Sequence, residues 1–185
     1  MMRAILIHGW DGYPEEGWFP KFKKDMEEQG FVVTIPAMEP AGAPQQAKWV
    51  PQLAGVVGVP DEDTYLVGHS AGCITILRYL EGLPEGAKVG GVVLVAGFTD
   101  PLGFEELKNY FATPIDWSKI RSKADEFIAI HSDNDEYVPL SHADVFKERL
   151  GAEVVILHDR KHFEDGSGIT DLPEARDAVL RSAGV

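Results

Sequence analysis

Cysteine is nearly absent from this chain, and positive charge is scarce. Cys73 is the single cysteine among 185 residues, so an internal disulfide is excluded. The chain has 17 lysines and arginines against 30 aspartates and glutamates, which gives a formal net charge of −13. Such a charge repels phosphate backbones and anionic lipid, and no stretch of the sequence is locally basic. We therefore expect no nucleic-acid partner and no membrane partner.

Long apolar runs and targeting segments are also missing. No apolar run approaches the ~20 residues that a transmembrane helix requires. No positively charged segment followed by an apolar stretch and small residues precedes the first predicted strand at Arg3–Ile7. Together with the lack of disulfides, these absences favour a cytoplasmic location. The length fits a single domain, residues 1–185, that buries roughly 70% of its unfolded surface around one core.

Six short apolar runs alternate with helix-like segments along the chain. Continuous runs of Val, Ile and Leu are typical of parallel strands that are buried on both faces. The pattern predicts an α/β fold with a doubly wound, mainly parallel six-stranded sheet and helices on both faces. The segment 99–123 mixes aromatic residues with prolines and predicts short helices near the mouth of a site, because it is too small for a large cap domain. The six runs are Ala4–Ile7, Val32–Ile35, Thr64–Val67, Val92–Val95, Phe127–Ile130 and Val154–Leu157.

The motif Gly68-His69-Ser70-Ala71-Gly72 is the most informative feature of the sequence. It follows the third apolar run and opens a helix-like run from Cys73 to Leu80. A strand that turns sharply into a helix crowds the backbone, so the flanking positions need glycine and the serine hydroxyl is exposed. The Ala71 amide lies at the positive end of that helix, where it would stabilise an oxyanion. The motif predicts a nucleophile elbow with Ser70 as the nucleophile.

A serine nucleophile needs a histidine base and a carboxylate that orients the base. Loops that follow parallel strands meet at one edge of the sheet, and two histidines follow the sixth apolar run. His162 lies in a charged loop and is favoured as the base, whereas His158 directly ends the run and is the alternative. The loop after the fifth run offers Asp133 and Asp135. Asp135 is favoured because the run that it begins leads into a capped helix, although acidic residues are also ordinary turn formers.

The order of these residues along the chain adds a further signal. Serine, then aspartate, then histidine is the order of α/β-hydrolases and differs from the chymotrypsin and subtilisin folds. A second oxyanion donor is expected after the first strand, where the Trp10 amide is suitably placed. A histidine base also predicts activity that declines below about pH 6.5. The side chains expected to line the substrate pocket are His8, Trp10, His69, Phe98 and Phe111.

Five segments carry a resemblance to a known family: Gly9–Gly12, Gly68–Gly72, Tyr110–Pro114 with Trp117, Ser132–Asp135 and Lys161–Phe163. With them the chain is similar, over nearly its whole length, to the small α/β-hydrolases typified by retinoblastoma-binding protein nine and its bacterial relatives. The resemblance implies a triad of Ser70, Asp135 and His162 and a serine hydrolase of carboxylesterase type that acts on small ester-like acyl substrates. One departure is Lys161, which precedes His162 where many hydrolases have glycine.

Other partners and cofactors are not expected. Binding to the retinoblastoma protein is not carried over, because the chain has no Leu-x-Cys-x-Glu motif. The sequence has no paired metal-ligand spacing, and no G-x-G-x-x-G follows the first strand, so we expect neither a metal nor a cofactor. Two alternatives stay open: a hydrolase-fold binding or scaffold protein with little turnover, and an amidase or peptidase that uses the same residues.

Overall fold

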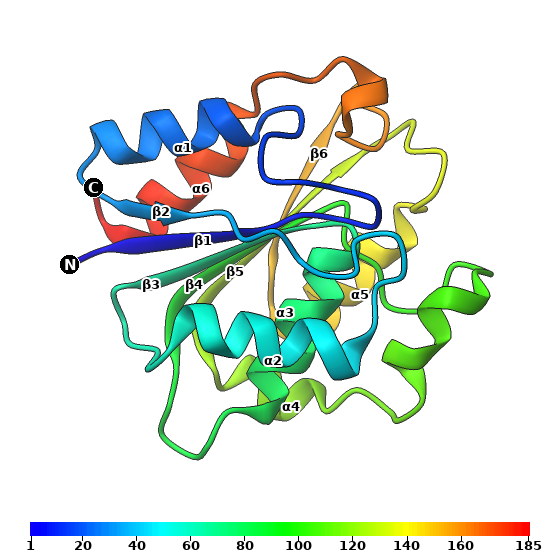
Figure 1. The fold of residues 1–185 in the computed structure, drawn as a ribbon, viewed down its shortest axis with the longest axis horizontal. Helices are drawn as coiled ribbons and strands as arrows, with labels where there is room; N and C mark the ends of the chain where they lie inside the picture. Colours follow the sequence, from blue (N-terminus) through cyan, green and yellow to red (C-terminus); the bar gives the residue numbers. More distant parts are fainter.

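A computed structural model describes all of residues 1–185 and contains one sheet of six parallel strands. The strand order is β2-β1-β3-β4-β5-β6 (Figure 1). The predicted doubly wound α/β fold is therefore confirmed. The strands are β1 Arg3–Ile7, β2 Val32–Thr34, β3 Thr64–His69, β4 Val89–Val95, β5 Ala124–Ser132 and β6 Glu153–Leu157.

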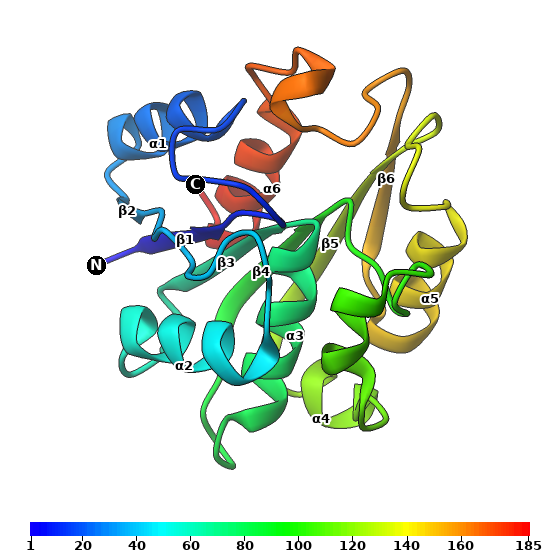
Figure 2. The same ribbon diagram turned by 45° about the vertical axis from the view of Figure 1, so that its right-hand side comes forward.

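Helices cover both faces of this sheet (Figures 1 and 2). One face carries α1 Phe19–Glu28 and α6 Pro173–Ala183, and the other carries α2 Gln46–Val57, α3 Ala71–Gly82, α4 Trp117–Arg121 and α5 Ser141–Leu150. Two short 3-10 helices, Glu105–Phe111 and Asp165–Ser167, follow β4 and β6. No helix combines the length and the apolar character that crossing a membrane would require.

Alternate residues of each strand enter two separate hydrophobic cores. In β1, Ile5 and Ile7 pack with the core beneath α2 and α3, whereas Ala4 and Leu6 pack with the core beneath α1 and α6. This division follows from the two-residue period of a strand, whose successive side chains point to opposite faces. It explains why the strands are continuously apolar in sequence.

The chain changes direction at β1, and this change positions the site. From β1 the chain forms β2 on one side and then crosses to β3 on the other side. In open parallel sheets, such a switch point leaves a crevice at the carboxyl ends of the strands. The loop after β1 and the turn after β3 meet there, because a Cβ built on Gly9 would lie 3.0 Å from the Cβ of Ser70.

Cys73 lies inside α3 and its side chain is buried. Its thiol lies 3.4 Å from the carbonyl oxygen of Val95, and burial raises the pKa of the thiol above its ordinary value. Cys73 is therefore a protonated, small core residue. Elsewhere in the fold, no three His, Cys, Asp or Glu side chains gather as potential metal ligands.

Candidate active site

Ser70 lies at the sharp turn that joins β3 to α3. Its backbone has φ 53° and ψ −117°, a conformation that side-chain-bearing residues rarely adopt. A Cβ on Gly68 would lie 2.8 Å from the amide nitrogen of Cys73, and a Cβ on Gly72 would lie 2.2 Å from the carbonyl oxygen of Ile7. Only glycine fits at either flanking position, so the turn has the crowding that the sequence motif predicts.

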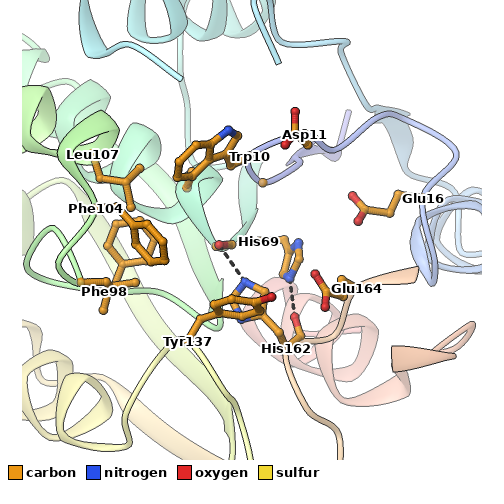
Figure 3. A pocket seen from close by; sticks show the side chains of 14 residues that line it. Trp10, Asp11, Glu16, His69, Phe98, Phe104, Leu107, Tyr137, His162 and Glu164 are labelled. Atoms are coloured by element: carbon orange, nitrogen blue, oxygen red, sulfur yellow. Dashed lines mark hydrogen bonds between the residues drawn. The ribbon is translucent and has the colours of Figure 1, made fainter. Parts of the chain in front are cut away.

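His162 links Ser70 to Asp135 through two hydrogen bonds. Ser70 Oγ lies 2.9 Å from His162 Nε2, and His162 Nδ1 lies 2.8 Å from Asp135 Oδ2. The His162 ring is only 8% exposed and packs edge-on against Tyr137, with ring centroids 5.0 Å apart (Figure 3). The structure thus brings together three residues that lie far apart in the sequence.

The Asp135 carboxylate is fixed by several donors. Its second oxygen, Oδ1, accepts hydrogen bonds from the amides of Tyr137 at 2.8 Å and Val138 at 3.0 Å. Burial raises the pKa of Asp135, but the hydrogen bonds from His162 and these two amides outweigh it and hold the pKa below its ordinary value. Asp135 is therefore ionised at neutral pH although its side chain is only 1% exposed.

The two alternatives for the base and the carboxylate lie elsewhere. His158 has a side chain that is 89% exposed, and its Nδ1 lies 2.6 Å from Asp133 Oδ2. The hydrogen bond and charge of Asp133 raise the pKa of His158. His158 and Asp133 form a separate surface pair, whereas His162 and Asp135 meet Ser70.

The amides of Trp10 and Ala71 have free donor capacity. Neither N–H donates a hydrogen bond to another protein group. Ala71 is the first residue of α3, where the helix supplies no acceptor for the amide. Both residues line the same cavity as Ser70, so two unsatisfied donors lie at the elbow.

His69 ties the elbow to the loop that carries His162. It is 2% exposed, and its Nε2 donates to the carbonyl oxygen of His162 at 2.7 Å, whereas its Nδ1 has no partner. Burial, followed by the neighbouring His162, lowers the pKa of His69 to about 3. His69 is neutral, and its ring contributes to the wall of the cavity.

The structure does not bring His8 and Phe111 to the cavity wall, which corrects two of the expected pocket residues. The His8 ring is fully buried, packs edge-on against Trp49 and accepts a hydrogen bond from the amide of Met38 at 2.8 Å. Phe111 packs behind Phe98, with ring centroids 6.3 Å apart. Phe111 therefore supports the wall through Phe98, whereas the His8 ring lies in the core beside Trp49.

The cavity at Ser70 has a volume of about 340 Å³ and two chemically different sides (Figure 3). Aromatic and aliphatic side chains lie on one side, carboxylates lie on the other, and His162 lies between them. No lysine or arginine lines the cavity. The apolar side includes Trp10, Phe98, Phe104 and Leu107, and the acidic side consists of Asp11, Glu16 and Glu164. Leu102 also lines the cavity.

Glu16 is the most perturbed acid of this wall. Its Oε2 is shielded from solvent and has no hydrogen-bond partner. Burial, followed by the negative charges of Asp165 and Glu164, raises the pKa of Glu16 to about 7. At neutral pH Glu16 is therefore only partly ionised, and the cavity has no lysine or arginine to balance the negative charge of its acidic side.

The fold and the elbow together define the class of protein. A parallel sheet with a serine on a strained strand-to-helix turn, at the carboxyl end of β3, is the architecture of a compact α/β-hydrolase. The sequence profile described as serine hydrolase matches residues 4–181. The chain belongs to this family, and the resemblance inferred from the sequence is confirmed.

Individual relatives span the same domain. YdeN of Bacillus subtilis (strain 168) is 31% identical over 178 residues, which cover 96% of this chain and 94% of that protein. The serine hydrolase RBBP9 of Rattus norvegicus is 28% identical over 168 residues, which cover 88% of each chain. The crystal structure of the B. subtilis ydeN gene product superposes with a TM-score of 0.95, at 30% identity and complete coverage of both chains. Est1E from Butyrivibrio proteoclasticus shares the fold, with a TM-score of 0.76 at 16% identity, covering 100% of this chain and 89% of that one.

Proposed function

We propose that this protein hydrolyses small ester-like acyl substrates through an acyl-enzyme intermediate on Ser70. The observation that carries the proposal is the unbroken pair of hydrogen bonds from Ser70 Oγ to His162 and from His162 to Asp135. A hydroxyl bound to imidazole in this way can lose its proton as it attacks, and an ionised carboxylate stabilises the imidazolium that forms.

In the first half-reaction, Ser70 Oγ attacks the ester carbonyl carbon and His162 Nε2 takes its proton. The carbonyl oxygen becomes an oxyanion, which the amides of Trp10 and Ala71 stabilise by hydrogen bonding. His162 then protonates the departing alcohol as the bond to the acyl carbon breaks. The acyl group is left on Ser70.

In the second half-reaction, water replaces the alcohol. His162 accepts a proton from the water as it attacks the acyl carbon, and the same two amides stabilise the second oxyanion. The bond to Ser70 Oγ then breaks, His162 returns the proton to the serine, and the carboxylic acid leaves. Throughout both steps, Asp135 holds the imidazole with its proton on Nδ1.

The size and lining of the cavity favour small substrates with at least one apolar group. Its volume of about 340 Å³ lies near the lower end of the range for small-molecule sites. The wall formed by Trp10, Phe98 and Phe104 offers an apolar surface beside the serine, and Trp10 and Phe104 pack edge-to-face with centroids 5.7 Å apart. Apolar acyl or alcohol groups are expected on that side.

We predict that the cavity discriminates against anionic acyl groups. Glu164 and Asp11, together with the partly ionised Glu16, repel a substrate carboxylate, and the cavity has no lysine or arginine to pair with it. The 4-nitrophenyl hemisuccinate ester should therefore show a kcat/KM at least about tenfold below that of its neutral methyl-capped diester. Initial rates for the two esters, measured at low and high salt, test the prediction. Equal rates would contradict an electrostatic role for this wall.

We predict that Asp135→Asn lowers kcat by about 10⁴-fold, because an amide does not hold His162 in the required tautomer. The matched change Asp133→Asn should cost less than about tenfold, because Asp133 pairs with the exposed His158. Steady-state rates for the two variants measure the difference. Similar losses in both would contradict the assignment of Asp135.

The same substitution also has an expected effect on stability. The pKa of Asp135 is depressed in the folded state, so its ionised form stabilises the fold above the ordinary carboxyl pKa of 3.8. That stabilisation is lost as the pH falls through the lower folded-state pKa. The difference in thermal midpoint between wild type and Asp135→Asn should therefore be larger at pH 7 than at pH 3.

The experiment that tests the function as a whole combines covalent labelling with turnover. The purified protein would be treated with a fluorophosphonate, which traps activated serines, and the adduct would be mapped by mass spectrometry. The same preparation would be assayed on 4-nitrophenyl esters and on the corresponding anilides. Labelling at Ser70 together with ester hydrolysis is the expected result.

The other outcomes separate the alternatives. Faster hydrolysis of the anilides than of the esters would identify an amidase that uses the same residues. A folded protein with neither labelling nor turnover would contradict the proposal and favour a binding or scaffold role for the cavity.

A further inference from the structure

We propose that Asn134 is a positioning residue that holds Lys161 in a left-handed backbone conformation and thereby aligns His162 with Ser70. The inference rests on the proposed function, since it concerns the geometry of the base in that reaction. It begins from the loop after β6, in which a lysine precedes the histidine.

This loop has an unusual backbone. Asp159, Lys161 and Phe163 all have positive φ, with values of 59°, 49° and 59°. Side-chain-bearing residues rarely adopt this conformation, whereas glycine adopts it readily. His162 therefore lies between two residues that need external support to keep their conformation.

The end of β5 and the loop after it supply that support, because each of the consecutive residues 132–135 forms a hydrogen bond with the loop after β6. Asn134 Oδ1 accepts from the amide of Lys161 at 2.8 Å, and Asn134 Nδ2 donates to Asp159 Oδ1 at 2.6 Å. Ser132 Oγ accepts from the amide of Arg160 at 2.9 Å and donates to Asn134 Oδ1 at 2.9 Å. Two further contacts join the same loops: Asp133 Oδ1 with the amide of Asp159 at 3.0 Å, and Asp135 Oδ2 with His162 Nδ1 at 2.8 Å.

Among the residues of the β5 loop that bind this backbone, Asn134 contacts the position nearest to His162, while His69 binds the His162 carbonyl from the elbow. Asn134 binds the amide of Lys161 and so fixes the peptide plane between Arg160 and Lys161, on which the φ of Lys161 depends. Without this contact the plane can turn, Lys161 can leave positive φ, and the imidazole of His162 moves. The Lys161 side chain is exposed and forms no hydrogen bond or ion pair. Its backbone conformation therefore depends on Asn134 rather than on contacts of its own side chain.

The location of Asn134 lets its role be separated from folding and from substrate binding. Its side chain is exposed, so its removal leaves no cavity in the core. It does not line the cavity at Ser70, so its removal takes no contact from a bound substrate. Loss of Asn134 should therefore lower kcat and leave KM and the thermal midpoint nearly unchanged.

The test uses the chain of residues 1–185 and four variants of it. Asn134→Ala should lower kcat by about 10- to 100-fold, with KM within roughly twofold of wild type. Adding Lys161→Gly to Asn134→Ala should recover most of that loss, because glycine takes positive φ without support. Adding Lys161→Ala instead should recover none of it, although it removes the same charge. Asp116→Ala is the control. It also removes an exposed side chain that accepts a hydrogen bond from a backbone amide, that of Lys119 at 2.9 Å in α4, and its kcat should match that of wild type.

A second readout does not depend on turnover. The proton shared between His162 Nδ1 and Asp135 gives a far-downfield NMR resonance when that hydrogen bond is well aligned. The resonance should weaken or shift upfield in Asn134→Ala and return with Lys161→Gly. If the wild type shows the resonance and this pattern but no turnover, the positioning role stands and the proposed function fails.

Two results would overturn the inference. One is an Asn134→Ala variant with wild-type kcat and an unchanged His162 resonance. The other is equal recovery by Lys161→Gly and Lys161→Ala, which would mean that the lysine charge, and not its backbone conformation, limits the reaction.

Discussion

Replacement of Ser70 or His162 by alanine is expected to lower kcat by about 10⁵- to 10⁶-fold. Without Ser70 no acyl-enzyme forms, and without His162 the serine hydroxyl has no base at 2.9 Å to take its proton. Initial rates on 4-nitrophenyl butyrate, with mass spectrometry to exclude traces of wild type, measure both losses.

The two losses should not add. In the proposed reaction Ser70 and His162 act on the same proton, so removal of the second group has no further step to slow once the first is gone. The double variant should retain the same residual rate as either single variant, and Ser118→Ala, at an exposed serine on α4, should retain wild-type kcat. Substantial turnover in His162→Ala would instead favour another base, and His158→Ala would then be the next variant to measure.

The sequence predicts the elbow well because steric crowding leaves few choices there. One steric constraint, the sharp turn from strand to helix, accounts for the apolar run before Ser70, the two flanking glycines and the helical run after it. The structure shows this constraint as close backbone contacts at Gly68 and Gly72. The strands are predictable for a similar reason, since burial on both faces demands continuous apolar residues. Their ends are less so: β4 and β5 begin earlier than expected, at Val89 and Ala124, where parallel pairing extends beyond the apolar runs.

The wall of the cavity is less predictable. Asp11, Glu16 and Glu164 look like solvated loop residues in the sequence, because nothing local distinguishes a carboxylate that faces solvent from one that faces a cavity. Leu102, Phe104 and Leu107 lie in the segment expected at the mouth of the site, but their order along the chain does not indicate which side chains point inward. Which side chains face the cavity depends on how separate loops pack together.

Helix starts show the same limit. Ser141 has the chemistry of an N-cap, but α5 places it one position inside the helix, after Leu140, with no side-chain cap. Leu140 and Ser141 follow Pro139, whose carbonyl accepts a hydrogen bond from the amide of His142 and so begins the turn earlier. The α2 helix includes Pro51 and Gly55, which ordinarily weaken a helix, and the burial of Trp49, Leu53 and Val57 in the core compensates for them.

Gly72→Ala is expected to destabilise the fold by about 3 kcal/mol or more. The added Cβ would lie 2.2 Å from the carbonyl oxygen of Ile7 and 2.9 Å from that of His8. Both atoms belong to the backbone at the end of β1, which is paired with β3 and cannot rotate away as a side chain would. Urea denaturation followed by circular dichroism measures the loss, and the shift should appear in the midpoint with little change in slope.

Gly55→Ala is the matched control, because it adds the same methyl group to a glycine that is also helical. Gly55 lies in α2, and a Cβ there would meet no atom within 4 Å. Alanine has the higher helix propensity, so this change should stabilise the fold by about 0.5–1 kcal/mol. Opposite signs for the two substitutions would attribute the effect at Gly72 to the close approach of the elbow helix to β1. If both changes proved equally mild, that approach would not constrain the elbow, and the requirement for glycine after Ser70 would need another explanation.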